Sequence, residues 1–193
     1  MRVRAPFHRA GWVYEEKVDG WRIMAYKDGD RVRLVSRHGR DHTRRFADVA
    51  RAIATLSPRT LVLDGEVAIY DQQLMSRFDW LREPEPDAVA SPPLLMAFDI
   101  LYHDHRDLTA RPLRDRRARL EDVVAGSELI FPVRRLGPDG PEAWRQVVER
   151  GYEGYVAKDE RSTYEGGATK SWLKIKQRGW TDAEERWRRV RIL

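Results

Sequence analysis

The feature that most constrains the fold is a hairpin signal in residues 21–37, which read WRIMAYKDGDRVRLVSR. Two β-favouring runs flank Asp28-Gly29, and an Asp-Gly pair in that setting is typical of a tight turn between antiparallel strands. Residues 61–70, LVLDGEVAIY, alternate in the same manner. Their apolar side chains fall on one face of a strand and the carboxylates of Asp64 and Glu66 fall on the other. The sequence therefore predicts antiparallel strands within residues 21–37 and 61–70.

The remaining pattern adds helices to this sheet. Apolar residues at helical spacing predict a helix over residues 46–56. Prolines near the start and glycines at the end predict helices over residues 112–126 and 141–151. A short helix is expected at 75–82, a charged helix at 182–190, and strands at 94–102, 155–158 and 171–177. The expected fold class is α+β, with mostly antiparallel sheets flanked by helices.

Composition limits the kind of protein. The 193 residues are enough for one domain, expected over residues 1–177 and followed by a tail at 178–193. There is no cysteine, which excludes disulfides, iron–sulfur clusters and zinc–thiolate sites. The longest uncharged run, residues 88–98, is far shorter than the roughly 20 apolar residues that span a bilayer. Without a leader-like N-terminus, we expect a cytoplasmic monomer that has no membrane partner.

Two groups of like charges lie on strand faces. Asp64 and Glu66 would repel each other unless a divalent cation or ligand hydroxyls lay between them, or unless their face were solvated. Lys174 and Lys176 share a face of the strand at 171–177, which suits a phosphate but is also typical of a protected sheet edge. The net charge, 36 − 31 = +5, fits either a polyanionic partner or a well-solvated surface.

Lys17 precedes an Asp19-Gly20 turn, which alone is weak evidence for a site. It gains weight from its place among six short motifs. In chain order these are Glu15–Arg22, Ser36–Gly39, Asp64–Glu66, Phe98–Leu101, Glu153–Lys158 and Lys174–Lys176. Their order and spacing resemble those of the adenylation domain of ATP-dependent DNA ligases, in the covalent nucleotidyltransferase superfamily. The resemblance covers about residues 14–177 and implies the ATP-grasp-like nucleotidyltransferase fold.

The resemblance implies a nucleophilic role for Lys17, which would attack the α-phosphate of ATP and carry AMP. An ordinary lysine is neutral in only about one molecule in a thousand near pH 7.4. Lys174 and Lys176 would bind the phosphate and favour loss of the proton. Mg²⁺ would be held by Glu153, with help from Asp64.

The same resemblance implies the nucleotide contacts. Glu66 and Arg22 would hold the ribose, Glu15 the adenine edge and Phe98 the adenine face. Arg37 would belong to both the ATP site and the DNA site. Lys158 lies on the opposite strand parity from Glu153, and we expect it at the surface.

DNA is the expected second substrate, because the enzyme would pass AMP to the 5′-phosphate of a nick during DNA repair or recombination. A basic run beside the second motif would contact its backbone, although a solvated helix start is the alternative. The residues of this run are Arg37, Arg40, Arg44 and Arg45.

Ligases of this family normally continue into an OB-fold domain, which the 17 residues after Lys176 cannot form. We therefore expect a catalytic core that works with a separate OB-fold or DNA-binding protein, near the bacterial nucleoid. The alternatives are a non-catalytic scaffold that binds nucleotide or DNA, and an RNA ligase or guanylyltransferase.

Overall fold

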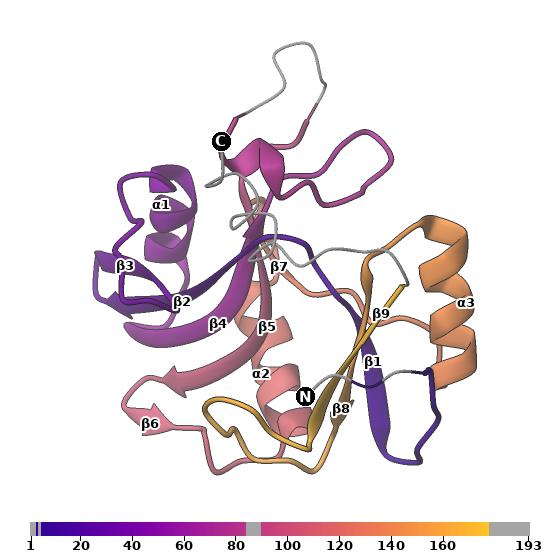
Figure 1. Cartoon of the computed structure of the whole chain (residues 1–193). Coiled ribbons are helices and arrows are strands. Elements are labelled where there is room, and N and C mark those ends of the chain that lie inside the picture. The colour runs from indigo at the N-terminus through magenta and orange to yellow at the C-terminus, as the bar shows by residue number, and fades with distance from the viewer. Residues whose placement is uncertain (1–2, 4, 84–89, 178–193) are drawn as a thin grey trace.

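Two mostly antiparallel sheets lie side by side in the computed structural model, which describes residues 3, 5–83 and 90–177 (Figure 1). The larger sheet has the strand order β3-β2-β4-β5-β6, and β7 pairs with β5 in parallel. Its strands are β2 (Trp21–Asp28), β3 (Arg31–Ser36), β4 (Thr60–Ala68), β5 (Leu94–His103), β6 (Arg106–Asp107) and β7 (Ile130–Pro132). The smaller sheet has the order β1-β8-β9, with β1 (Trp12–Glu16), β8 (Gly154–Asp159) and β9 (Trp172–Lys176).

Two helices, α1 (Ala47–Thr55) and α2 (Leu113–Val124), cover one face of the larger sheet. Ile53 of α1 and Leu120 of α2 are fully buried with Ile23 and Leu63 of the strands. Burial of such side chains is the main source of stability, worth roughly 1.5–3 kcal/mol each. The helices take the apolar face of the alternating strands, so the face that carries Arg22 and Glu66 is left for a site.

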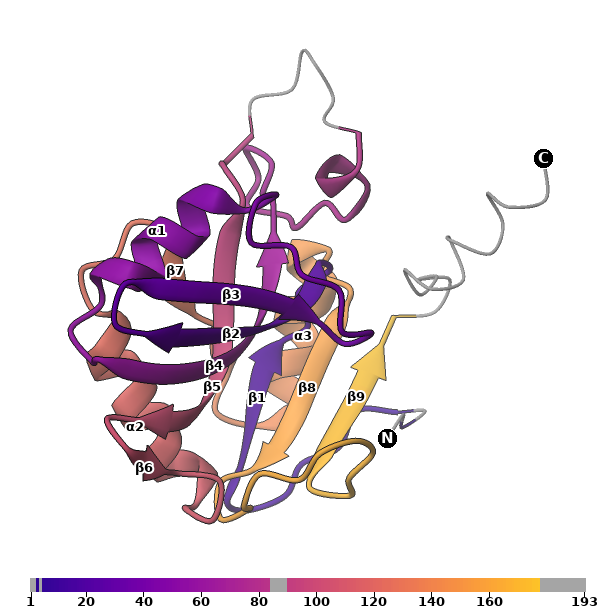
Figure 2. The same cartoon turned by 90° about the vertical axis from the view of Figure 1, so that its left-hand side faces the viewer.

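The third helix, α3 (Gly140–Arg150), packs on the smaller sheet (Figure 2). The Asp139 side chain caps its start by accepting a hydrogen bond from the Glu142 backbone N–H at 2.8 Å. Gly151 ends it in the left-handed region, with a φ of 71°. Ala143 and Val147 of α3 are fully buried, so the opposite face of the smaller sheet turns towards the larger sheet.

Most elements predicted from the sequence are confirmed. The hairpin β2–β3 turns at Gly29, whose φ is 56°, and all three long helices begin and end within two residues of their predicted limits. The helix predicted at 75–82 is wrong, because only a single 3₁₀ turn, Asp79–Leu81, forms there. Strands β1, β6 and β7 were not predicted; the last two are very short, and none has a clear alternating pattern. The charged helix predicted at 182–190 lies outside the described residues.

A β-bulge interrupts the pairing of β5 with β4 beside Phe98. Asp64 pairs with Asp99 and Gly65 pairs with Ala97, so Phe98 has no partner across β4. Such an extra residue bends the strand and redirects its side chain. Phe98 lies with Leu94 and Met96 on the face away from the helices, and the extra residue returns Ile100 to the buried face. Among the described residues, no helix has the length and apolar character required to cross a membrane.

Candidate active site

Lys17 lies at the end of β1, where the two sheets meet. Its backbone N–H donates to the Gly154 carbonyl oxygen at 3.0 Å, which fixes the segment against β8. Its ammonium donates to Glu153 Oε2 at 2.6 Å, and its side chain is only 15% exposed. Lys176 Nζ lies 2.7 Å from the other oxygen, Glu153 Oε1. One buried carboxylate therefore bridges the two lysines.

Gly154 makes this close approach possible. A Cβ atom at this position would lie 2.0 Å from the Ile175 carbonyl oxygen of β9. Any larger residue would push β8 away from β9, and with it Glu153 away from Lys176. The sequence pair Glu153-Gly154 thus combines a charged group with the backbone space that it needs.

Glu66 and Lys174 belong to the same electrostatic cluster. Burial raises the pKa of Glu66 to about 7, and the nearby Lys17 and Lys174 ammonium groups oppose that rise. The pKa of Lys174 is lowered, first by loss of solvent around its ammonium, although much of the residue is exposed, and then by the Lys17 charge. The sequence motifs that carry these side chains are 49 or more positions away from Lys17, and the fold brings them together.

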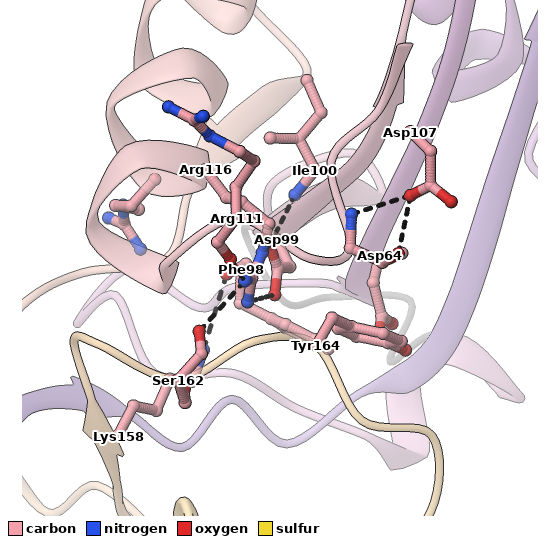
Figure 3. A network of polar contacts seen from close by, with 12 residues as sticks. Asp64, Phe98, Asp99, Ile100, Asp107, Arg111, Arg116, Lys158, Ser162 and Tyr164 are labelled. Carbon is pink, nitrogen blue, oxygen red and sulfur yellow. Dashed lines mark hydrogen bonds and ion pairs between the residues drawn. The ribbon is translucent and has the colours of Figure 1, made fainter.

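Arg22 and Asp64 form a two-pronged ion pair on the larger sheet. Arg22 Nε lies 3.0 Å from Asp64 Oδ1 and Nη2 lies 2.6 Å from Oδ2. Tyr164, from the loop between β8 and β9, donates its hydroxyl to Asp64 Oδ2 at 2.8 Å (Figure 3). This buried carboxylate raises the pKa of Arg22, first through its hydrogen bond. The contact also ties the smaller sheet to β4.

Aromatic rings and cations form the other end of the site. The Phe98 and Trp172 rings meet edge to face, with centroids 5.9 Å apart. The Lys158 ammonium lies 4.0 Å from the Trp172 centroid and 4.7 Å from the Phe98 centroid. The Arg22 guanidinium lies 5.4 Å from the Phe98 centroid. Cation–π contacts of this kind orient both partners.

Glu15 is buried behind these rings. Its Oε1 accepts from Arg117 Nη1 of α2 at 2.7 Å, and its Oε2 forms an ion pair with Lys158 Nζ. The Glu15 and Lys158 side chains are each 2% exposed. A buried carboxylate needs such partners, because an unpaired charge in the interior is very costly.

A second buried ion pair supports this end of the site. Arg116 of α2 donates twice to Asp99 of β5, both at 2.8 Å, and once to the Ser162 carbonyl oxygen at 3.1 Å (Figure 3). Both side chains of the pair are fully buried. The network anchors the segment that leads to Tyr164, and so holds that hydroxyl on Asp64.

The four arginines predicted to bind DNA are all exposed, but the structure gives them different surroundings. Arg40 lies in the turn after β3, where its carbonyl oxygen accepts from the Ser36 N–H at 2.9 Å. Arg45 lies over the Trp21 ring at 4.8 Å and donates to the Leu81 carbonyl oxygen. Arg45 therefore has an intramolecular role, while DNA binding by Arg37, Arg40, Arg44 and Arg45 stays a prediction.

The acidic side chains of the site could supply only part of a metal's ligands. Within residues 3, 5–83 and 90–177, no three acidic or histidine side chains gather closely enough to hold one alone. Mg²⁺, however, commonly takes one or two carboxylates and fills its other positions with water and phosphate. Glu153, whose carboxylate lies beside Lys17 and Lys176, fits that donor set as one ligand. A metal role for Asp64, whose carboxylate binds Arg22 and Tyr164, stays a prediction.

Sequence reasoning missed two kinds of residue. Lys158 is buried rather than at the surface, because Glu153 lies in a bend before β8 and strand parity cannot be counted from it. Trp172 and Lys158 are cross-strand neighbours, which places both on the site face. Tyr164 and Arg117 carried no local signal, since only the folded chain brings a loop and a distant helix to these carboxylates.

Comparison with known proteins gives a consistent family. Residues 3–176 match the family described as ATP dependent DNA ligase domain. The multifunctional non-homologous end joining protein LigD of Pseudomonas aeruginosa is 32% identical over 171 residues, which are 87% of this chain and 20% of that protein. The DNA ligase of Thermococcus fumicolans is 36% identical over 178 residues, covering 85% of this chain and 32% of that one.

Solved structures agree with the sequence matches. Mycobacterial DNA ligase D complexed with ATP and MES has a TM-score of 0.79 and 31% identity, covering 94% of this chain and 59% of that one. The ligase domain of Mycobacterium tuberculosis LigD gives a TM-score of 0.78, also at 31% identity, over 91% of this chain and 57% of that one. The chain thus spans about a fifth to a third of the curated relatives named above.

Proposed function

Because the chain belongs to the ATP-dependent DNA ligase domain family, we propose that it is a ligase catalytic core whose Lys17 becomes adenylylated by ATP. The observation that supports this most is the buried bridge from Lys17 through Glu153 to Lys176. The bridge holds an amine, a second cation and a carboxylate together between the sheets, and Lys174 and Glu66 belong to the same electrostatic cluster. That is the set of charges needed to transfer a nucleotidyl group from a triphosphate.

The residues divide the nucleotide between them. Phe98 would stack on adenine, and Glu15 would accept from its edge. Glu66 and Arg22 would bind the ribose hydroxyls, with Asp64 and Tyr164 holding the Arg22 guanidinium. Lys174 and Lys176 would bind the α-phosphate. Arg37 would contact the nucleotide from the turn after β3.

Covalent transfer begins with the release of Lys17. Phosphate oxygens compete with Glu153 for Lys176 and Lys17, and the freed ammonium gives up one proton to solvent. The amine then attacks the α-phosphorus, a phosphorus–nitrogen bond forms, the bond to pyrophosphate breaks and a second proton leaves the nitrogen. Mg²⁺, held by Glu153, would neutralise charge on the phosphates.

DNA would be the acceptor of the carried AMP. An oxygen of the 5′-phosphate at a nick attacks the lysyl-AMP phosphorus, and the amine of Lys17 leaves and regains its proton. The 3′-hydroxyl then attacks the activated 5′-phosphate, and AMP departs. A role in DNA repair, in the bacterial cytoplasm near the nucleoid, is proposed because several relatives are named for non-homologous end joining.

The test uses ATP labelled at the α-phosphate, with Mg²⁺. We expect an acid-labile adduct that maps to Lys17, and no adduct in Lys17→Ala. Lys170→Ala removes an exposed lysine of the loop before β9 and should label normally. The proposed function would be ruled out if the folded wild-type chain took up no label, or if the label mapped to another residue.

Two other functions give different results in the same assay. A non-catalytic scaffold would bind nucleotide or DNA without labelling, and its binding would not depend on Lys17. An RNA ligase or guanylyltransferase would label but would prefer an RNA nick or GTP. Competition of ATP with GTP, and of nicked DNA with nicked RNA, separates these enzymes from a DNA ligase.

A further inference from the structure

The open face of the larger sheet carries a groove at the end that lies away from Arg22. Its volume is about 470 Å³, within the range of pockets that hold small organic groups, and its wall is largely apolar. The strand pairs place one row of lining side chains across four strands, and that row consists of Arg33, Tyr26, Val62 and Tyr102. The neighbouring row holds Arg31, Asp28 and Thr60. We call this surface the distal groove.

The distal groove lies on the same face of the sheet as the proposed nucleotide contacts. Tyr26 follows Arg22 by four residues on β2, so the two side chains share a face and lie about 13 Å apart. That distance equals about four nucleotides of a DNA strand, which rises by roughly 3.4 Å for each nucleotide. Strand β3 runs from Arg33 to the turn that carries Arg37 and Arg40, where DNA is expected. A strand that leaves the nucleotide site therefore reaches the groove after a few nucleotides.

Tyr26 is the lining residue that the packing of the fold does not explain. It is 45% exposed, and in the described part of the chain only three other large apolar side chains are exposed, namely Leu74, Phe131 and Val148. The side chain of Tyr102, in the same row, is half-buried. An exposed aromatic ring on a sheet face is a surface on which a nucleobase can stack.

The charges around the groove suit a polyanion. Arg31 and Arg33 line it and are exposed, and they face one lining carboxylate, that of Asp28. Arg33 pairs with Asp41 at 3.3 Å, but the two side chains are 68% and 47% exposed. Such a solvated pair is weak, so a phosphate can compete for the guanidinium. The groove thus offers a ring to a base and cations to the phosphates beside it.

We propose that the distal groove binds an unpaired base of DNA close to the strand ends being joined, stacked on Tyr26. Paired bases do not fit this role, because their faces are covered inside the duplex, whereas sheets with exposed aromatic rings bind the bases of single strands. The occupant is therefore a single-stranded segment such as a protruding end. The inference rests on the proposed function, since that function supplies DNA as the partner.

The test measures the binding of a nicked duplex with an unpaired tail that begins about four nucleotides from the nick, by fluorescence anisotropy. Tails of both polarities are compared with the same tails made of abasic sugar-phosphate, which keep the charge but have no base to stack. We expect the wild type to bind the tail with bases, in one polarity, roughly tenfold more tightly, which is the scale of one stacked base. Equal affinity for the two kinds of tail in both polarities would overturn the proposal.

Variants of Tyr26 locate the stacked base. Tyr26→Ala should lose the preference for the tail with bases, whereas Tyr26→Phe keeps the ring and should keep the preference. Phe131→Ala is the matched control, because it removes an exposed ring of β7 that does not line the groove, and it should behave as the wild type. If Tyr26→Ala shows no melting transition, Tyr102→Ala removes the other ring of the row and should lose the preference instead. A preference that survives in the folded alanine variant would overturn the proposal.

A second copy of the chain in the groove would give a different result. The wild type would then be a dimer in analytical ultracentrifugation and Tyr26→Ala a monomer, with no preference for bases in either, and the proposal would be overturned. Failure of the proposed function is a separate outcome, because the anisotropy measurement does not require labelling of Lys17. A chain that labels Lys17 with ATP but shows no preference for bases would lose this inference alone.

Discussion

At the scale of single residues, the site depends on carboxylates that each bind two partners. Glu153 binds two lysines, Glu15 binds a lysine and an arginine, and Asp64 binds an arginine and a tyrosine. Glu66 differs, because burial raises its pKa to about 7 and its charge therefore changes near neutral pH. The protonation of Glu66 can therefore be followed in solution through the pH dependence of stability.

We expect Glu66 to make the folded chain less stable as pH rises from about 4.5 to about 7. The folded state binds the Glu66 proton more tightly than the unfolded state does, so the contribution is fully present below pH 4.5 and is lost through pH 7. Urea unfolding of wild type and Glu66→Gln across this range should diverge by at most about 3 kcal/mol.

The variant should gain stability relative to wild type as pH rises, and the difference should level off above pH 7. Glu165→Gln, at an exposed glutamate in the loop before β9, should follow the wild type at every pH. A constant difference between Glu66→Gln and wild type would show that the Glu66 carboxyl titrates normally.

At the scale of elements, β4 and β5 carry the site because of Gly65 and the bulge at Phe98. A Cβ atom on Gly65 would lie 2.8 Å from Leu95 Cδ1 and 2.9 Å from the Met96 carbonyl oxygen. We expect Gly65→Ala to cost about 1–3 kcal/mol of unfolding free energy, because the strands must separate. Gly166→Ala, which adds a methyl group in open space, should change it by less than about 0.5 kcal/mol. Urea unfolding of both variants measures this, and equal costs would contradict it.

Prediction from the sequence succeeded where the signal was local. The Asp28-Gly29 hairpin, the helix ended by Gly151 and the six motifs that indicated the family were all readable as short patterns. The bulge was not, since it depends on how β5 meets β4. Lys158 was misplaced because Glu153 lies in a bend before β8, so strand parity could not be counted from it.

At the scale of the whole molecule, the site lies between two sheets, and the exposed arginines border the larger one. We expect Arg40→Ala with Arg44→Ala to weaken binding to nicked duplex DNA and to reduce the slope of log affinity against log salt by about 2. Labelling of Lys17 by ATP should be unchanged. Fluorescence anisotropy over a range of salt concentrations measures the slope.

Arg119→Ala is the control, because Arg119 is exposed on α2, which covers the face away from the site. Its salt slope should match that of the wild type. If the double variant also keeps the wild-type slope, DNA does not contact the turn after β3.

The carboxylate bridge has a consequence for chemical selectivity in a crowded cell. An amine engaged as a salt is unreactive towards carbon dioxide, aldehydes and activated acyl groups, all of which modify free lysines. Glu153 would therefore keep the nucleophile inert during idle periods. A ligand anionic enough to draw both ammonium groups away from Glu153 would free Lys17. ATP itself would therefore activate the nucleophile.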